Sequence, residues 1–256
     1  MLPSHLLLTV PLGLVLAAAV AALACRAQAL TRSGAFAAWA VGAVVFGVGG
    51  WPAAGALLTF FGTSSALSRW RRRQKEALGY EKNGRRDAGQ VLANGGVAAA
   101  CLLLTLVGVK AGSLLFLAAL AAANADTWAT EIGSAWGGHP VDIRTGRRAE
   151  AGMSGAVSLP GTLAALAGAA GLGLFAGSFP LFLIVTLAGF GGALCDSVLG
   201  ATVQAQWRDP GNPARWTEQP QPGPPERGLR GVGNDAVNWL CTLSAAGLAA
   251  LLCRLL

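Results

Sequence analysis

The chain has 256 residues, of which 54% are hydrophobic and only 12% are charged, and its mean hydropathy is +0.53. Soluble domains usually carry about 25% charged residues, so this composition excludes an ordinary soluble domain and indicates an integral membrane protein. The net charge is +7. The basic residues are clustered between long apolar runs, which favours membrane-protein loops over a nucleic-acid surface.

Apolar segments near 20 residues long are typical of membrane-spanning helices. They predict an all-α, polytopic transmembrane protein of about eight helices, with residues 1–256 forming a single transmembrane domain without β-sheet. The second segment is short, so six or seven helices is the alternative count. The segments are residues 4–25, 33–49, 51–69, 88–109, 112–134, 156–175, 179–205 and 235–254.

The apolar stretch Leu6 to Ala24 of the first segment is followed by Cys25 and has no basic n-region before it, so the segment is interpreted as a retained transmembrane helix rather than a signal peptide. The five cysteines show no C-x-x-C spacing and are odd in number. They therefore predict small buried side chains, not a disulfide or metal framework. Two histidines are too few to build a histidine metal site.

Basic residues alternate between the loops. The odd-numbered loops carry nearly all of the arginines and lysines, whereas the even-numbered loops carry only Lys110. The positive-inside rule therefore predicts a multi-pass protein of the cell membrane whose odd loops and active side face the cytoplasm, with both termini outside. The seventh loop, residues 209–233, is rich in proline and is expected to be irregular.

Five carboxylates fall toward the predicted cytoplasmic ends of the helices: Asp87, Asp126, Glu131, Asp196 and Asp235. A carboxylate in a membrane helix is costly and marks a functional site by default. Carboxylates hold Mg²⁺, which bridges phosphate oxygens, and basic side chains neutralise the remaining phosphate charge. The pattern predicts a magnesium–phosphate centre. The alternatives are that Asp126 and Glu131 are solvated beyond the membrane edge and that Asp196 only packs.

Helix geometry limits how these acids can meet. At about 100° per residue, Asn124, Thr127 and Glu131 share one stripe, and Asp126 lies about 140° from Glu131. A straight helix therefore does not aim both acids at one ion. Either the helix breaks near Gly133, or the two acids have different partners. Farther along, Gly192, Asp196, Gly200 and Gln204 share a helix face, and the glycines permit close approach by a neighbouring helix or ligand.

Polar side chains also occur where lipid-facing residues would be apolar. The hydroxyls of residues 61–69 either bond the preceding helical turn or face the site. The glycine-rich stretch 152–162 runs into a helix whose free N–H groups can cradle phosphate, although such a stretch also makes ordinary turns. Asn234 lies beside Asp235 at a helix start, where an N-cap is the simpler interpretation.

The stretch A-D-T-W-A-T-E-I-G, residues 125–133, resembles the signature of an integral-membrane family of formerly unknown function that includes the plant phytyl-phosphate kinase of vitamin E synthesis. Further motifs that support the resemblance are F-F-G-T-S-S-A-L-S-R, R-R-D-A-G-Q-V-L-A-N-G-G, G-M-S-G-A-V-S-L-P-G-T, C-D-S-V-L-G-A and N-D-A-V-N, which together run from Phe60 to Asn238.

The resemblance implies a membrane kinase that transfers a phosphoryl group from a nucleoside triphosphate, with CTP as a candidate, to an isoprenyl monophosphate such as phytyl or geranylgeranyl phosphate. Mg²⁺ is the expected cofactor. Membrane lipids are expected partners, nucleic acid is not, and the oligomeric state is left open. The main alternative is a transporter or lipid flippase with intramembrane acids. A structural membrane subunit would leave the five carboxylates unexplained.

The predicted site residues combine the charge pattern with the motifs. Asp126, Glu131 and Asp196 are the predicted catalytic acids, and the same three with Asp235 are the predicted metal ligands. The predicted phosphate or substrate contacts are Arg69, Lys82, Arg85, Arg86, Asn94, Ser154, Asn234 and Asn238.

Overall fold

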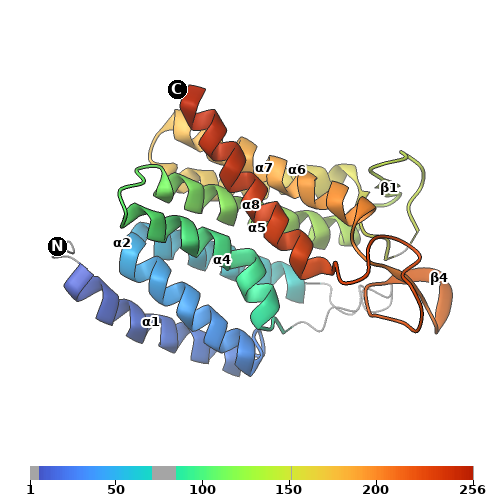
Figure 1. The fold of residues 1–256 in the computed structure, drawn as a ribbon, viewed down its shortest axis with the longest axis horizontal. Coiled ribbons are helices and arrows are strands. Elements are labelled where there is room, and N and C mark those ends of the chain that lie inside the picture. The colour runs from blue at the N-terminus through green and yellow to red at the C-terminus, as the bar shows by residue number, and fades with distance from the viewer. Residues whose placement is uncertain (1–5, 71–84, 151, 256) are drawn as a thin grey trace.

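The computed structural model describes residues 6–70, 85–150 and 152–255. Seven α-helices account for most of these residues (Figure 1). They are α1 (Leu6–Arg26), α2 (Arg32–Arg69), α4 (Ala88–Thr105), α5 (Gly112–Trp136), α6 (Leu159–Gly173), α7 (Phe179–Thr202) and α8 (Asn234–Leu252), with the short 3₁₀ turns η1 (Leu174–Ala176) and η2 (Cys253–Leu255). The predicted all-α polytopic fold is therefore confirmed.

Helix α2 consists of two antiparallel halves. Gly50 has φ 64° and ψ −156°, outside the helical region, and Pro52 follows it. The second half returns to the start of the first, because the Arg69 guanidinium donates a 2.7 Å hydrogen bond to the carbonyl oxygen of Ala27. Divided at Gly50, the seven helices give eight apolar segments, and the predicted segments 33–49 and 51–69 match the two halves of α2.

Helix α5 is the centre of the bundle. It packs against α2, α4, α6, α7 and α8, whereas α1 packs along α2 at one edge (Figure 1). Every residue of α5 from Phe116 to Ala125 is buried. Alanines dominate this stretch, and small side chains let the neighbouring helices approach closely. A side chain at the end of this stretch is therefore positioned by several helices at once.

Among the described residues, six helices are long and apolar enough to cross a membrane by length and composition: α1, α2, α4, α6 with η1, α7, and α8 with η2. The polar residues in the second half of α5 lower its mean hydropathy, although this helix is the one most surrounded by protein. A buried helix does not need a lipid-compatible surface, so polar groups are tolerated where they face protein or a water-filled cavity.

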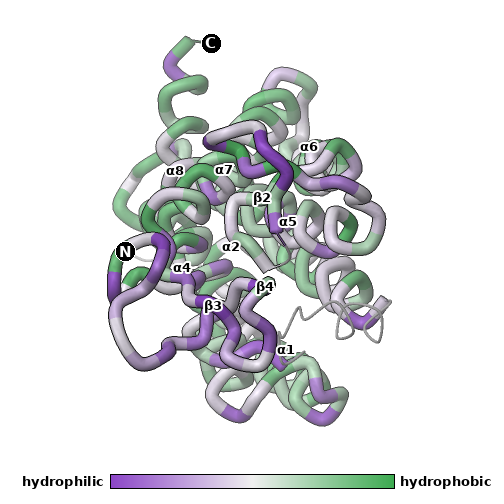
Figure 2. The backbone as a smooth tube through the Cα atoms, turned by 90° about the vertical axis from the view of Figure 1, so that its right-hand side faces the viewer, coloured by the Kyte–Doolittle hydropathy of each residue, from purple (hydrophilic) through white to green (hydrophobic). Residues whose placement is uncertain are grey.

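The odd-numbered loops of the sequence prediction meet at one end of the helix bundle. Arg86 exchanges backbone hydrogen bonds with Ala29 and Thr31, and Arg227 pairs with Asp142 across the two later loops. Figure 2 views the molecule from this end, where hydrophilic segments gather around β3 and β4. We call this the arginine-rich end. The predicted separation of basic and neutral loops is thus present in the fold.

Two short antiparallel ribbons stand at the arginine-rich end. Strands β1 (Val141–Asp142) and β2 (Ala156–Val157) pair with each other, as do β3 (Trp207–Asp209) and β4 (Asn212–Thr217). The expectation of no β-structure and of an irregular seventh loop was therefore wrong in its details. The prolines concealed this ribbon, because Pro210 lies in its tight turn and Pro213 near the start of a two-stranded edge, where a missing N–H is tolerated.

Candidate functional site

A polar cavity of about 1020 Å³ lies at the arginine-rich end. The second half of α2, together with α4, α5, α6, α7 and α8, forms its walls, and the loops around β2 and β4 contribute to its lining. Its residues come from segments far apart in the chain, so the cavity exists only in the folded protein. Several of the predicted site residues line it.

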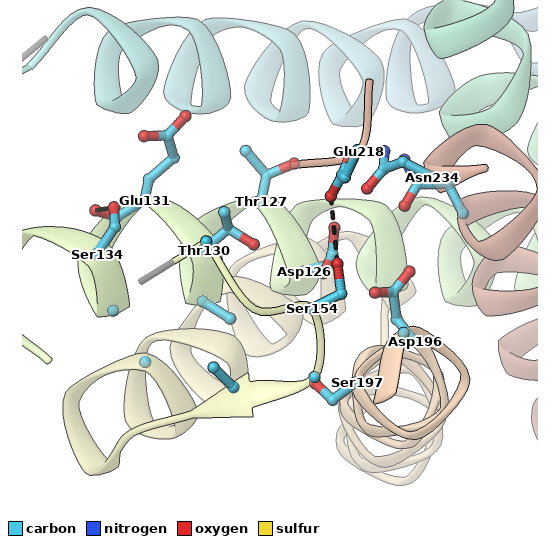
Figure 3. Close-up of a pocket in the computed structure, with 18 of the residues that line it drawn as sticks. Asp126, Thr127, Thr130, Glu131, Ser134, Ser154, Asp196, Ser197, Glu218 and Asn234 are labelled. Carbon is cyan, nitrogen blue, oxygen red and sulfur yellow. Dashed lines mark hydrogen bonds between the residues drawn. The ribbon is translucent and has the colours of Figure 1, made fainter. Parts of the chain in front are cut away.

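Asp126 and Glu131 lie on different sides of this cavity. Helix α5 continues through Gly133 to Trp136, so the helix does not break, and the two acids take separate directions. Figure 3 shows Asp126 near Asp196, while Glu131 lies apart and extends toward α2. The Ser68 hydroxyl donates a 2.6 Å hydrogen bond to Oε1 of Glu131. Of the two alternatives left by helix geometry, the structure supports separate partners.

Asp126 of α5 and Asp196 of α7 lie near each other at the cavity wall (Figure 3). Close packing around this pair depends on Gly192, because a Cβ there would lie 2.8 Å from Ala122 and 2.9 Å from the Cys241 carbonyl oxygen. Mg²⁺ is commonly held by only one or two carboxylates, with phosphate and water completing its six ligands. The described residues contain no cluster of three or more His, Cys, Asp or Glu suited to a metal.

Two of the predicted arginines line the cavity, namely Arg69 and Arg86. The Arg86 side chain lies over the rings of Phe60 and Phe61, with centroid distances of 5.7 and 5.6 Å. Burial lowers the pKa of the Arg86 guanidinium, and the negative charge of Glu131 opposes that shift. A partly desolvated guanidinium binds an anion through strong charge-assisted hydrogen bonds.

The structure separates several predicted site residues from the cavity. Arg85 is exposed and does not belong to the lining, and neither does Asp235, which packs against Gly89 at the start of α4. Asp87 caps α4 by accepting a 3.0 Å hydrogen bond from the N–H of Gln90. The prediction for Lys82 falls outside the described residues.

The predicted amide and hydroxyl contacts line the cavity: Asn94, Ser154, Asn234 and Asn238. Asn234 is not the N-cap of α8, because Gly233 occupies that position. Ser154 belongs to the glycine-rich stretch and donates its hydroxyl to Glu218 at 3.3 Å (Figure 3). The start of α6 is capped by Ser158, which accepts from the N–H of Gly161 at 3.2 Å.

Gln206 holds the glycine-rich stretch in place and was missed by sequence reasoning. Its side chain is fully buried. It accepts a 3.0 Å hydrogen bond from the N–H of Ser154 and donates a 2.9 Å hydrogen bond to the carbonyl oxygen of Gly152. The sequence around it, A-Q-W, offers no signal of this role, because the interaction joins residues more than fifty positions apart.

A group of charged and aromatic side chains roofs the cavity. Glu150 accepts hydrogen bonds from Arg208 and from Trp216 Nε1, the latter at 2.8 Å. The hydrogen bond from Arg208 lowers the pKa of Glu150, with a smaller contribution from Trp216. Arg208 also stacks on the Trp216 ring at 4.0 Å. Trp216 itself lines the cavity, so these contacts fix one wall of the site.

The salt bridge between Arg227 and Asp142 fixes a second part of the roof. It measures 3.0 Å, and the two side chains are only 15% and 9% exposed. Arg227 and Arg144 also donate to the carbonyl oxygen of Ala201, at 3.1 and 3.2 Å. Positive groups at a helix C-terminus are favourable, so Arg227 and Arg144 together stabilise the last turn of α7 beside the cavity.

The fold and cavity define a polytopic integral membrane protein with an acid-lined polar chamber at one end. The chain belongs to the family described as integral membrane protein DUF92, whose model matches residues 15–246. The expected family resemblance is therefore confirmed. No solved structure matches the chain.

Relatives of the chain come from bacteria, archaea and plants. An uncharacterized membrane protein of Synechocystis is 32% identical over 183 residues, covering 66% of this chain and 70% of that protein. An uncharacterized membrane protein of Methanocaldococcus jannaschii is 33% identical over 149 residues, covering 57% and 62%. Protein VTE6, chloroplastic, of Arabidopsis thaliana is 32% identical over 190 residues, covering 68% of this chain and 56% of that protein.

Proposed function

We propose that this protein is a membrane kinase that phosphorylates an isoprenyl monophosphate to the diphosphate with a nucleoside triphosphate and Mg²⁺. A phosphate oxygen of the lipid would attack the γ-phosphorus, and the bond from that phosphorus to the bridging oxygen would break, releasing the nucleoside diphosphate. The observation that carries this proposal is a cavity lined by paired carboxylates and arginines at one end of an apolar helix bundle.

The family adds support for this choice. Its motifs resemble those of a family that includes the plant phytyl-phosphate kinase, and the matched relatives include Protein VTE6 of Arabidopsis. CTP is our candidate phosphoryl donor. The chain spans 56% to 70% of the length of the relatives described above, and we propose the substrate and the donor for this chain.

The charge of the cavity gives a physical reason for a divalent cation. Among the described residues, the lining contains five carboxylates and three guanidinium groups: Asp126, Glu131, Asp196, Asp209 and Glu218, against Arg69, Arg86 and Arg215. Two phosphorylated substrates would be repelled by this excess of negative charge. Mg²⁺ supplies the missing positive charge when it bridges phosphate oxygens.

Each group then has a proposed role. Asp126 and Asp196 would hold Mg²⁺, while Arg69 and Arg86 would bind the phosphate of the lipid through charge-assisted hydrogen bonds. Glu131 and the predicted contacts that line the cavity, namely Asn94, Ser154, Asn234 and Asn238, would orient these groups. Phosphoryl transfer needs little covalent chemistry from the protein, so catalysis would come from positioning and charge neutralisation.

One observation favours a second candidate, a transporter or lipid flippase. Asp126 lies ten residues before the end of α5, about 15 Å along the helix axis at 1.5 Å per residue. This depth brings it toward the middle of the helix, where acids of transporters are found. The kinase proposal accounts for more of the lining, because arginines and hydroxyls accompany the acids.

Substitution of Asp126 by Asn tests the proposal. The change keeps the size of the side chain and removes the charge proposed to hold Mg²⁺, so turnover should fall about 100-fold or more. Purified protein in detergent would receive geranylgeranyl or phytyl phosphate, Mg²⁺ and each nucleoside triphosphate, with the diphosphate quantified.

The matched control is Glu226→Gln, because Glu226 is outside the cavity lining and its contact with Arg208 is exposed. Its turnover should match that of the wild type. Absence of product with every donor, together with ion or lipid flux in liposomes, would replace the kinase by the transporter. Equal turnover in Asp126→Asn and wild type would remove Asp126 from the catalytic centre.

A further inference from the structure

A second, apolar groove of about 350 Å³ opens between the end of α1 and the second half of α2. Its lining consists of Val20, Leu23, Ala24, Ala27, Ala29, Phe61, Gly62, Ser65, Ala66 and Arg69. Of these ten residues only Ser65 and Arg69 are polar. Leu23 is 64% exposed, so the groove is open to the surroundings of the bundle, which in a membrane are lipid chains.

The groove adjoins the polar cavity. Four residues line both spaces: Ala27, Ala29, Ser65 and Arg69. Arg69 lies at the junction, where its guanidinium donates to the carbonyl oxygen of Ala27. Phe61 marks the same boundary, because its ring lines the groove while Arg86, which lines the cavity, lies 5.6 Å from its centroid. A cationic head-group region thus adjoins an apolar channel.

We propose that this groove holds the hydrocarbon tail of an isoprenyl monophosphate whose phosphate lies in the cavity beside Arg69 and Arg86. The inference rests on the proposed function, and it adds the route by which the lipid reaches the acids. A substrate with a charged head and an apolar tail requires adjacent polar and apolar spaces, and these two spaces share a wall. A groove of this size lies at the small end of ligand pockets, so it would hold the first isoprene units, with the rest of the tail in the bilayer.

Gly62 provides a substitution that tests the groove directly. It lies on the exposed face of α2, and a Cβ there would meet no atom within 4 Å. Gly62→Phe would therefore fill the groove without a clash against the described residues. The matched control is Gly247→Phe in α8, another exposed helical glycine with no atom within 4 Å of its Cβ position.

The first measurement is photolabelling, which does not depend on turnover. Protein in lipid nanodiscs would be irradiated with geranylgeranyl monophosphate that carries a diazirine on its second isoprene unit, and labelled residues would be mapped by mass spectrometry. We expect labels on Leu23 and Phe61. Excess unmodified geranylgeranyl phosphate should compete with them, whereas geranylgeraniol, which lacks the phosphate, should not. Gly62→Phe should reduce the labelling about tenfold because it occupies the binding space, and Gly247→Phe should leave it unchanged.

The second measurement separates this inference from the kinase proposal. Gly62→Phe should lower diphosphate formation from geranylgeranyl phosphate but spare that from dimethylallyl phosphate, whose tail is too short to need the groove. Labelling that spreads evenly over lipid-facing helices, or that is unchanged in Gly62→Phe, would overturn the groove even if the wild type is an active kinase. Specific labelling lost in Gly62→Phe, in a protein that forms no diphosphate with any donor, would retain the lipid-phosphate site and reject the kinase.

Discussion

At the scale of single residues, Asn124 joins three helices at the centre of the bundle. It is 1% exposed and lies on α5. Its Nδ2 donates a 2.8 Å hydrogen bond to the Gly168 carbonyl oxygen of α6, while its Oδ1 accepts from Thr63 and Ser64 of α2 at 3.3 and 3.4 Å. The hydroxyls near the end of α2 therefore have two roles. Those of Thr63 and Ser64 link α2 to α5 through Asn124, whereas that of Ser68 contacts Glu131 at the cavity.

Asn124→Leu should destabilise the protein. The change keeps a similar volume but leaves the hydroxyls and the Gly168 carbonyl oxygen without this partner, at a cost of about 1–2 kcal/mol. The measurement is the thermal unfolding temperature in detergent. Thr202→Val is the control, because that hydroxyl bonds only carbonyl oxygens of its own helix. A loss in Asn124→Leu no larger than the control's would contradict the role of Asn124 as a link between helices.

At the scale of elements, Gly50 turns the chain between the two halves of α2. Its φ of 64° and ψ of −156° fall in a region that is occupied essentially only by glycine. The nearest atom to a Cβ at this position is Cδ of Pro52, at 4.0 Å. The requirement for glycine therefore comes from backbone conformation and not from crowding.

Gly50→Ala should lower the free energy of unfolding by about 1–3 kcal/mol, because the backbone must keep a conformation that disfavours any Cβ. Thermal unfolding in detergent measures this loss. Gly171→Ala in α6 is the control: it is a helical glycine with open space around its Cβ position, so alanine should be neutral or stabilising by up to about 1 kcal/mol. Equal stability of Gly50→Ala and the wild type would show that the turn can adopt another conformation.

At the scale of the whole molecule, the two ends of the bundle differ in charge. The cavity, its roof and the junction with the groove all lie at the arginine-rich end. The opposite end carries Lys110 in the connection between α4 and α5, and Arg254 near the C-terminus. From the positive-inside rule we expect the arginine-rich end to face the cytoplasm, where nucleoside triphosphates would be available to a kinase.

Cysteine accessibility on intact cells tests this orientation. In a background with Cys253→Ser, a membrane-impermeant maleimide should label Lys110→Cys directly, but should label Thr145→Cys only after permeabilisation, because the two exposed positions lie at opposite ends. Labelling of Thr145→Cys in intact cells would reverse the orientation and place the cavity outside. Such an outcome would also remove the cytoplasmic nucleotide pool as a phosphoryl source.

The sequence by itself determined the apolar segments, the break between residues 49 and 51, and the clustering of basic loops. These features depend on local hydropathy and on Gly and Pro, which act over a few residues. Helix periodicity left two alternatives for Asp126 and Glu131, a break near Gly133 or separate partners, and the unbroken α5 keeps the two acids apart. Of the charged residues grouped from the sequence, Asp126, Glu131, Asp196, Arg69 and Arg86 line one cavity, whereas Asp87, Asp235 and Arg85 do not.

Only the tertiary structure decided which of these groups meet. Asp126 pairs spatially with Asp196 because α5 packs on α7 through glycine and alanine, a choice that no local pattern specifies. The same holds for Gln206 and the glycine-rich stretch, for the ribbon of β3 and β4, and for the groove beside Gly62. Each of these features depends on contacts between segments that are distant in the sequence. One hydropathy pattern allows several helix arrangements, and the energy of side-chain packing selects among them.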